Sequence, residues 1–341
     1  MMDMINIVYR LKSPKFFEEA IDEIELDGVV VRPTYLSICQ ADQRYYQGSR
    51  PGDVLEKKLP MALIHEAIGE VVYDNSGKFS QGDKVVMIPN TPEGEDVCRA
   101  NYSYKSKFRG SGFDGFTSDL VKLEPSRAVK IPDDFNPHVA VFIELISVAY
   151  QGINKFLDLA ITPKDVLGVW GDGNLGFITA LLLKEKFPDS KIIVFGKHLE
   201  NLNLFSFADE IHQIHNVPEN LTIDHAFECV GSSASQSAIE QIIDLINPQG
   251  TINLFGVSEY PVPINTRMIL EKGLTIQGNS RSEREDFEGV VETLKQNPQL
   301  FEYLEKLVTN ICEVKTLDDL KNAFDKDHIS HFGKTVMKWN K

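Results

Sequence analysis

The first 140 or so residues alternate short apolar runs with polar segments rich in Gly, Pro, Asn and Asp. Apolar runs at 28–35 (GVVVRPTY), 69–73 and 84–88 have the length and composition of β-strands. The segments between them are typical of turns and loops. This pattern predicts a mostly β domain with irregular connections.

The pattern changes at residues 142–156 (FIELISVAYQGINKF), where apolar positions follow a helical period. Strand-like and helix-like segments then alternate as far as residue 280. The expected strands are 166–170, 191–195, 225–229 and 251–255, and the expected helices include 177–186 and 235–245. This alternation predicts an α/β domain with a doubly wound parallel sheet.

The last segment carries helical patterns and ends in a strand-like run at 333–339 (GKTVMKW). We expect it to fold back on the first domain. The predicted organisation is therefore a mostly β domain at 1–145, a doubly wound α/β domain at 146–280 and a return segment at 281–341. A chain of 341 residues is long enough for two such domains.

The net charge of the chain limits the kinds of molecule that it is expected to bind. The 35 Lys and Arg against 50 Asp and Glu give a formal charge of -15, which disfavours nucleic acid and anionic membranes. A small phosphorylated metabolite stays possible, because a Debye length of about 8 Å limits the reach of the outer charge. Cysteine usage agrees with a reducing, cytoplasmic location, since only Cys39, Cys98, Cys229 and Cys312 occur and they are widely spaced. We find no signal peptide and no apolar run long enough to span a membrane.

A glycine-rich motif, GDGNLG, directly follows the expected strand at 166–170 and precedes an apolar helix. In that setting the motif favours dinucleotide binding over an ordinary Gly-rich turn, because the turn brings backbone N–H groups close to a pyrophosphate. The residues assigned to the cofactor are Gly171, Gly173, Asn174, Leu175 and Gly176.

The end of the next strand bears on cofactor choice. An NAD-binding domain carries Asp or Glu there to bind the ribose hydroxyls, whereas this chain has Gly196, Lys197 and His198. The missing carboxylate and the added cation together favour NADPH over NADH. The alternative is that Lys197 is a solvated loop residue.

Four dispersed residues offer metal ligands of mixed type: Cys39, His65, Glu66 and Glu144. Each alone reads as an ordinary core or surface residue. Together they provide a thiolate, an imidazole and carboxylates, which suit a catalytic Zn²⁺ with one open position.

The order of motifs along the chain resembles the zinc-dependent medium-chain alcohol and polyol dehydrogenases. The motifs are SIC-x-x-D, HEAIGEVV, QGDKVV, IELISV and GDGNLG. The resemblance implies a GroES-like catalytic domain joined to a Rossmann domain. It also implies that Cys39, His65, Glu66 and Glu144 surround one catalytic zinc.

Within that family the chain is similar to the bacterial ribulose-5-phosphate reductases. The similar stretches include DQRYYQGSRPG, KLPMALIHEAIGEVV, GSGFDGF and GVSEYPVPINTRMILEKGLTIQGNSRS. The resemblance implies NADPH-dependent reduction of D-ribulose 5-phosphate to D-ribitol 5-phosphate, which supplies CDP-ribitol for wall teichoic acid or capsule. It also implies a homodimer and a functional pairing with a ribitol-5-phosphate cytidylyltransferase. The alternatives are a dehydrogenase of an unphosphorylated polyol or of threonine, and a non-catalytic NADPH-binding protein.

Two departures from the family pattern matter. The segment at 88–105 contains only Cys98, so a second, structural zinc held by four cysteines is not possible. Gln40 and Ala41 follow Cys39 where the family commonly has Gly and then Ser or Thr, and alanine cannot relay a proton. Glu66, Tyr45 or zinc-bound water are the substitutes.

A sugar-phosphate substrate also requires cations for its phosphate. The arginines nearest in sequence to Cys39 are Arg44 and Arg50. Arg281 and Arg109 are further candidates, and Lys107 is a weaker one.

Overall fold

The computed structural model describes residues 3–93, 100–330 and 332–341 and forms two compact units. The first unit comprises residues 1–147 and 281–341, and the second comprises residues 148–280. Cys98 lies outside the described residues.

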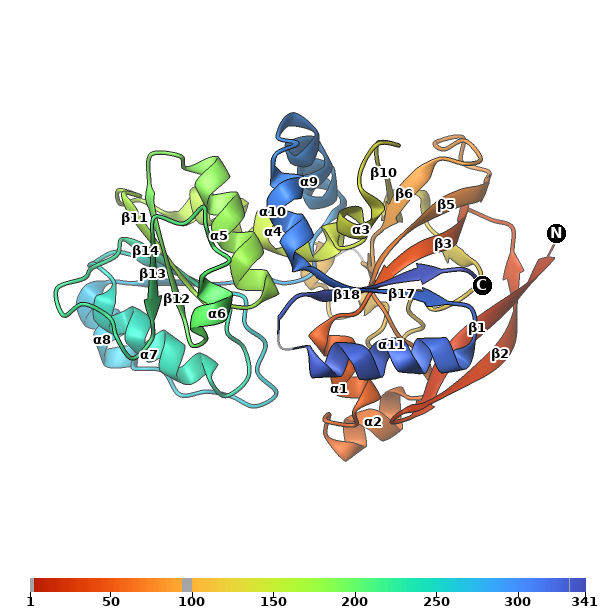
Figure 1. Cartoon of the computed structure of the whole chain (residues 1–341), viewed down its shortest axis with the longest axis horizontal. Coiled ribbons are helices and arrows are strands. Elements are labelled where there is room, and N and C mark those ends of the chain that lie inside the picture. The colour runs from red at the N-terminus through yellow and green to blue at the C-terminus, as the bar shows by residue number, and fades with distance from the viewer. Residues whose placement is uncertain (1–2, 94–99, 331) are drawn as a thin grey trace. The chain divides into compact units, whose positions relative to one another are not determined.

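The first unit is mostly β. Its larger sheet has the strand order β10-β6-β5-β3-β18-β17 (Figure 1), and β9 pairs with residues 29–31 of β3 on the edge away from β5. These strands are β3 (Val29–Ser37), β5 (Glu66–Asp74), β6 (Lys84–Met87), β9 (Val121–Leu123), β10 (Ala128–Lys130), β17 (Val308–Val314) and β18 (Lys334–Trp339). A second sheet, β2-β1-β4, is built on a long hairpin of β1 (Asp3–Ser13) and β2 (Phe16–Glu25) with β4 (Met61–Ala62). The short strands β7 (Asn90–Thr91) and β8 (Lys107–Phe108) form a separate pair.

The return segment belongs to the sheet of the first unit. β18 pairs antiparallel with β3 and parallel with β17, so the last strand lies beside the strand that leads to Cys39. Strand β3 is buried along most of its length because its apolar residues face the large core cluster of this unit.

Helices of the first unit are short except for α9 and α11. They are α1 (Gln40–Tyr46), α2 (Gly52–Lys58), α3 (Pro137–Ala140), α9 (Arg284–Gln296), α10 (Leu300–Leu304) and α11 (Leu317–Ile329), with 3₁₀ turns at Ala100–Tyr102, Pro125–Arg127 and Glu305–Leu307. Helix α11 begins at a capping box in which Thr316 accepts a hydrogen bond from the backbone of Asp319. It packs on β17 and β18 (Figure 1). Helix α4 (Ile143–Leu159) begins in the first unit and ends in the second.

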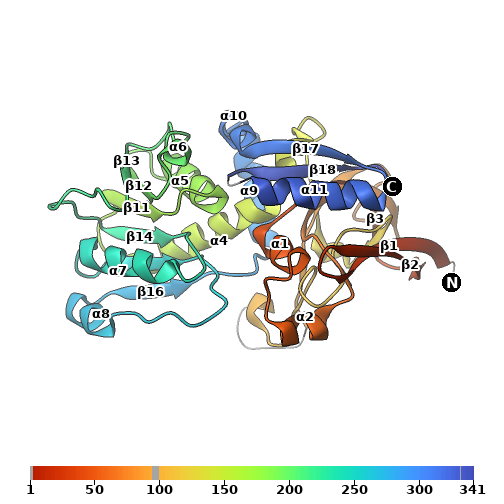
Figure 2. The same ribbon diagram turned by 60° about the horizontal axis from the view of Figure 1, so that its bottom comes forward.

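The second unit contains a six-stranded parallel sheet in the order β13-β12-β11-β14-β15-β16. The strands are β11 (Val166–Trp170), β12 (Lys191–Gly196), β13 (Glu210–Gln213), β14 (His225–Glu228), β15 (Thr251–Leu254) and β16 (Thr275–Gly278). Helices α5 (Asn174–Lys186) and α6 (Leu199–Leu202) lie on one face, and α7 (Ser235–Leu245) and α8 (Thr266–Lys272) lie on the other (Figure 2). The order reverses at β11, which is the switch point where such sheets bind nucleotides.

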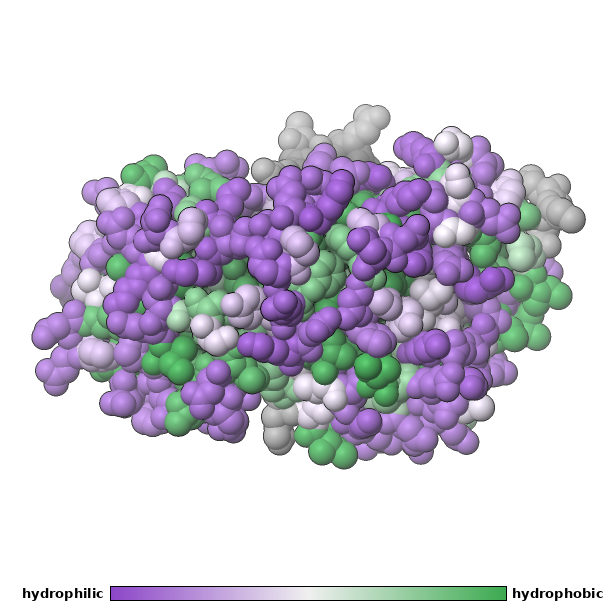
Figure 3. Space-filling view, turned by 45° about the horizontal axis from the view of Figure 1, so that its top comes forward, coloured by the Kyte–Doolittle hydropathy of each residue, from purple (hydrophilic) through white to green (hydrophobic). Residues whose placement is uncertain are grey.

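The visible face in Figure 3 is mainly hydrophilic, with apolar residues scattered or in small groups. Among the described residues, no helix combines the length and apolar character needed to cross a bilayer.

Candidate active site

Three of the predicted metal ligands converge in the first unit. The thiol of Cys39, the imidazole of His65 and the carboxylate of Glu66 each place one donor atom within 4.8 Å of the others. Glu66 and His65 are buried and Cys39 is half-buried. We call these three residues the donor group.

Cys39 is positioned by the turn from β3 into α1. Helix α1 is fixed on α11, because the Gln43 amide donates to the Phe324 carbonyl at 2.8 Å and the Tyr46 hydroxyl donates to Asp325 at 2.9 Å. The aromatic rings of Tyr46 and Phe324 also pack, with centroids 4.8 Å apart. The thiol therefore stands on a rigid turn at the edge of the core.

Asp42 ties the two segments of the donor group together. Its buried carboxylate accepts hydrogen bonds from the backbone N–H of Cys39 at 3.1 Å and of Ile64 at 3.0 Å. The same carboxylate lies 3.4 Å from Nδ1 of His65. A carboxylate beside one imidazole nitrogen can orient the ring and leave the other nitrogen for a metal, although Nδ1 of His65 has no hydrogen-bond partner among the described residues. The sequence motif SIC-x-x-D contained this residue, but only the structure shows its role.

The backbone before His65 is held in an uncommon conformation. Ile64 has a positive φ of 72°, which is rare for a β-branched residue. A Cβ on Gly115 would lie only 2.2 Å from the Leu63 carbonyl oxygen, so Gly115 is needed for the close approach of the two segments. Such conformations cluster at functional sites, where surrounding structure holds them.

Electrostatics favour a charged or metal-bound imidazole. Burial alone lowers the pKa of His65, but the neighbouring Asp42 carboxylate and Cys39 thiol outweigh it and raise the pKa well above its ordinary value. The site thus already holds the negative charge that a cation would neutralise.

Glu66 is paired with Lys334, the first residue of β18. The Lys334 ammonium donates to Oε1 of Glu66 at 2.6 Å, and both side chains are almost fully buried. Burial lowers the pKa of Lys334, yet Glu66 and Cys39 reverse this effect and raise it. Oε2 of Glu66 has no hydrogen-bond partner among the described residues. The sequence did not single out Lys334 as a residue of this site, because it has the pattern of one more polar position in a strand.

The donor group fits a zinc ion. Thiolate, imidazole and carboxylate are the ligand types of catalytic zinc sites, and a buried carboxylate oxygen without a partner is costly unless something binds it. Cys39, His65 and Glu66 are therefore the residues that would hold it.

Glu144 lies near this group but outside it. It stands in the first turn of α4 and is buried. Burial raises the pKa of Glu144 to about 7, while the nearby charge of His65 lowers it and that of Glu66 raises it by smaller amounts. The structure therefore brings Glu144 into electrostatic range of the donor group, while the set within 4.8 Å contains only the other three residues.

The glycine-rich turn has the geometry of a nucleotide site. Gly171 has a φ of 127°, which only glycine adopts easily, and a Cβ on Gly176 would lie 1.9 Å from the Gly171 carbonyl oxygen. A Cβ on Gly173 would meet nothing within 4 Å, so space is open where helix α5 begins. The first-turn N–H groups of a helix have no intrahelical acceptor, and this turn therefore fits a pyrophosphate. Asn174 and Leu175 form the first residues of that helix.

An acid does reach the end of β12, from an unexpected position. The Asp172 carboxylate accepts hydrogen bonds from the backbone N–H groups of Lys197 at 2.8 Å and His198 at 2.5 Å. Nδ1 of His198 lies 3.1 Å from the same oxygen. The side chain of Lys197 is exposed. The sequence argument considered only residues 196–198 and therefore missed Asp172. The carboxylate of Asp172 accepts two backbone hydrogen bonds and lies beside the His198 ring.

The cationic side chains predicted to bind the substrate phosphate differ in the partners that they already have. The Arg109 guanidinium donates to the carbonyls of Asp114 at 3.2 Å and Lys122 at 2.7 Å, which fixes its loop. Lys107 forms an ion pair with Glu93. These two side chains are engaged in the structure of the loop.

The three other arginines occupy separate elements. Arg44 lies in the last turn of α1, and Arg50 places its guanidinium carbon 4.8 Å from the centroid of the Tyr45 ring. Arg281 has a positive φ of 57°, and its carbonyl accepts a hydrogen bond from the Asn101 amide at 2.9 Å.

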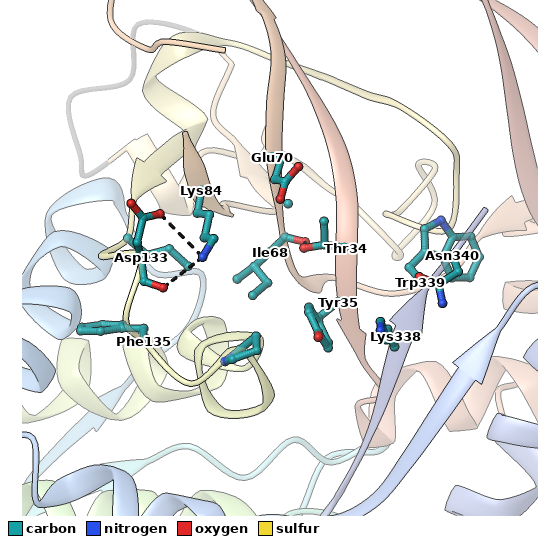
Figure 4. A pocket seen from close by; sticks show the side chains of 13 residues that line it. Thr34, Tyr35, Ile68, Glu70, Lys84, Asp133, Phe135, Lys338, Trp339 and Asn340 are labelled. Carbon is teal, nitrogen blue, oxygen red and sulfur yellow. Dashed lines mark hydrogen bonds and ion pairs between the residues drawn. The ribbon is translucent and has the colours of Figure 1, made fainter. Parts of the chain in front are cut away.

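A cavity of about 320 Å³ lies elsewhere in the first unit (Figure 4). Its lining includes Tyr35, Glu70, Lys84, Asp133 and Lys338, and no member of the donor group. The Lys84 ammonium donates to the Asp133 carbonyl at 3.0 Å, so its charge is already engaged with Asp133 (Figure 4). This cavity is separate from the donor group.

Comparison with known proteins decides the family. Residues 25–133 match the alcohol dehydrogenase GroES-like domain, and residues 199–296 match the zinc-binding dehydrogenase domain. The chain is 52% identical to a ribulose-5-phosphate reductase of Bacillus spizizenii over 98% of this chain and 99% of that protein. The chain belongs to the ribulose-5-phosphate reductase family of zinc-binding dehydrogenases. This finding confirms the family and the fold class predicted from the sequence.

Other members of the family agree. Ribulose-5-phosphate reductase 1 of Staphylococcus aureus is 51% identical over 98% of this chain and 99% of its own length. The structure of S. aureus TarJ in complex with NADPH has a TM-score of 0.90 and 48% identity, covering 99% of this chain and all of TarJ. The predicted cofactors, zinc and NADPH, are those of this family.

Proposed function

We propose that the chain catalyses NADPH-dependent, zinc-assisted reduction of D-ribulose 5-phosphate to D-ribitol 5-phosphate. The observation that carries this proposal is the buried donor group of Cys39, His65 and Glu66, set in a chain 52% identical to a ribulose-5-phosphate reductase. The first unit is then the catalytic domain with its return segment, and the second is the NADPH-binding domain.

The reaction adds a hydride to the ketone carbon and a proton to its oxygen, which yields a secondary alcohol and NADP⁺. When bound, zinc would polarise the carbonyl and NADPH would supply the hydride. The protein orients the parts: Asp42 lies beside the His65 ring, and Lys334 balances the charge of Glu66. Gly171, Gly173 and Gly176 shape the turn for the pyrophosphate, and Lys197 is the cation for the 2′-phosphate.

The biological setting is part of the proposal. The product would feed CDP-ribitol for wall teichoic acid or capsule, in pairing with a cytidylyltransferase. A cytoplasmic location is supported by the free thiols of Cys39, Cys229 and Cys312, since a ligand thiol must stay reduced.

A homodimer is supported by the outer edge of the second unit. β16 is the last strand of its sheet, and apolar side chains of Val257, Tyr260 and Leu270 in the segments before it are exposed by 62%, 71% and 81%. An unpaired strand edge with apolar neighbours is a surface that proteins commonly cover. Light scattering on the purified chain tests the dimer, and Leu270→Glu should weaken it.

The deciding experiment is NADPH oxidation with ribulose 5-phosphate, ribulose, xylulose 5-phosphate and fructose as substrates. We expect kcat/KM to be highest for ribulose 5-phosphate, because a remote phosphate can use its binding energy to position the carbonyl. Equal values for ribulose and ribulose 5-phosphate would refute a sugar-phosphate reductase and favour a polyol dehydrogenase.

A further inference from the structure

Lys58 ends helix α2 with its ammonium held between two hydroxyl groups. Nζ donates to the Tyr45 hydroxyl at 3.1 Å and to the Ser111 hydroxyl at 3.1 Å. The aliphatic stem lies against Gly112, where a Cβ would be 3.7 Å from Cε of Lys58. The ammonium is therefore fixed in position rather than extended into solvent. We call Lys58, Tyr45 and Ser111 the Lys58 cluster.

The charge of Lys58 is not balanced by a carboxylate. In the parts of the chain that the structure describes, no acidic side chain forms an ion pair with it, whereas Lys107 pairs with Glu93. An ammonium has three N–H donors, and the two partners of Lys58 are neutral oxygens. One donor and the full charge are left for a ligand.

A second cation stands by the same aromatic ring. The Arg50 guanidinium carbon is 4.8 Å from the Tyr45 ring centroid, and Lys58 Nζ is 5.8 Å from it. The electron-rich face of the ring attracts both cations. The Tyr45 ring is therefore flanked by two cationic side chains.

The cluster is joined to the donor group by short segments of chain. Ser111 follows Gly110, where a Cβ would lie 3.5 Å from Nδ1 of His65. Tyr45 belongs to helix α1, which begins directly after Cys39. The turn that carries Ser111 and the helix that carries Tyr45 therefore both border the donor group.

We propose that the Lys58 cluster binds the phosphate of the sugar-phosphate substrate while the carbonyl end lies at the donor group. This inference rests on the proposed function and names its phosphate site. A phosphate monoester carries about two negative charges at neutral pH and accepts hydrogen bonds at three oxygens. Lys58 supplies the charge, and the two hydroxyls can turn their protons toward the same anion.

The experiment compares Lys58→Met with Lys57→Met, a matched control. Lys57 is the preceding residue of α2, exposed and with the same charge. For each variant we would measure kcat/KM with ribulose 5-phosphate and with free ribulose. We expect Lys58→Met to lower the ratio of the two values by roughly 10- to 100-fold, the effect of one charge-assisted hydrogen bond. Lys57→Met should leave the ratio unchanged, and Lys58→Arg should keep most of it.

A binding measurement serves as a second readout. Ribitol 5-phosphate should raise the melting temperature of the NADPH-loaded wild type and of Lys57→Met, and raise that of Lys58→Met much less. Unliganded melting temperatures and NADPH affinity show whether each variant is folded, and Lys58→Gln replaces Lys58→Met if that variant is not.

The outcomes separate the two proposals. Equal losses on both ketones in Lys58→Met would assign Lys58 to positioning or proton transfer and overturn the phosphate site. An unchanged ratio would also overturn it and leave the reductase assignment intact. A wild type that does not distinguish the two ketones would instead refute the proposed function itself.

Discussion

The two units of this chain use buried polar groups in opposite ways. In the first unit, ionisable side chains from distant segments face one another: Cys39, His65, Glu66 and Lys334 are drawn together from three strands or turns. Among the described residues of the second unit no such cluster of metal-ligating side chains occurs, and a buried carboxylate bonds to backbone N–H groups. Glu228, for example, accepts hydrogen bonds from the N–H groups of Val230 at 2.9 Å and of Gly256 at 3.1 Å.

This difference follows from what each unit would bind. A metal requires side-chain donors, which many parts of the chain can supply only after it has folded. A pyrophosphate can be bound by the N–H groups of one turn, so a single short sequence motif can form its site. The comparison predicts that single substitutions in the first unit disturb charge balance, whereas those in the second change local hydrogen bonding or cofactor choice.

The largest expected effect is loss of turnover in Cys39→Ser or His65→Ala. Removing a zinc ligand removes several kcal/mol of stabilisation of the developing charge, or roughly a thousandfold or more in kcat/KM. NADPH affinity, measured by fluorescence titration, should stay close to that of the wild type, because we propose that the other unit binds the cofactor.

Zinc content gives the matching measurement. We expect about one zinc per chain in the wild type and far less in these variants, because the described residues contain a single ligand set of this kind. Cys312→Ser is the control for loss of a thiol in the same unit. Two tightly bound zinc ions per chain, or loss of NADPH affinity in both variants, would contradict this division between the units.

The next largest effect is on stability, in Lys334→Met. This change leaves the Glu66 carboxylate buried without its cation, and breaking such a pair costs about 3–5 kcal/mol. Thermal unfolding of the metal-stripped protein isolates this cost from any loss of zinc affinity.

The double variant Lys334→Met with Glu66→Gln is the control. It removes both charges, so its melting temperature should lie above that of Lys334→Met alone. If the double variant is no more stable than the single one, the pairing of Lys334 with Glu66 is not the source of the loss.

The sequence predicted the second unit more completely than the side-chain contacts of the first. The strand at 166–170 and the helix at 235–245 match β11 and α7, because each is a continuous apolar pattern. The motif GDGNLG could be interpreted in the same way, since its neighbours in space are its neighbours in sequence.

The sequence could not predict the roles of Lys334, Asp42 and Lys58, because nothing near these residues in sequence shows what lies beside their side chains.

Asp172 shows the same limit within the nucleotide unit. The residues at 196–198 contain no acid, and the sequence therefore gives no sign of a carboxylate there. The acid comes instead from the turn after β11 and holds the backbone of Lys197 and His198. Parallel pairing of β11 with β12 brings the two strand ends together, and that contact is a product of the sheet.

A third prediction concerns cofactor choice and Lys197. If its ammonium binds the 2′-phosphate, Lys197→Ala should weaken NADPH by about 1.5–3 kcal/mol and NADH by far less. Fluorescence titration with both cofactors measures the two affinities. Lys186→Ala, at the exposed end of α5, is the matched control and should change neither. Equal losses for NADPH and NADH would mean that Lys197 binds a part that the two cofactors share.

The smallest effect contrasts two buried histidines. His65 has a raised pKa among charged groups, whereas burial in the second unit lowers the pKa of His225. Nδ1 of His225 accepts the N–H of Thr251 at 3.1 Å, and Nε2 lies 3.0 Å from the Pro163 carbonyl oxygen. The ring is thus held neutral, with its proton on Nε2, because a proton on Nδ1 would face the Thr251 N–H.

This arrangement predicts that acid destabilises the second unit through His225. Below the ordinary histidine pKa of about 6.5, His225 binds a proton in the unfolded chain but stays neutral in the folded one. The free energy of unfolding therefore falls as the pH decreases from there.

His225→Gln should lower the free energy of unfolding by about 1–2 kcal/mol at pH near 7.5, because it disturbs a buried hydrogen bond. Its deficit relative to the wild type should shrink at pH near 5.5, because the variant lacks this titration. Denaturant unfolding at the two pH values measures both quantities, with His215→Gln on the exposed surface as the control. A deficit that grows on acidification would show that the folded state binds the proton at His225, and the contrast between the two histidines would then be wrong.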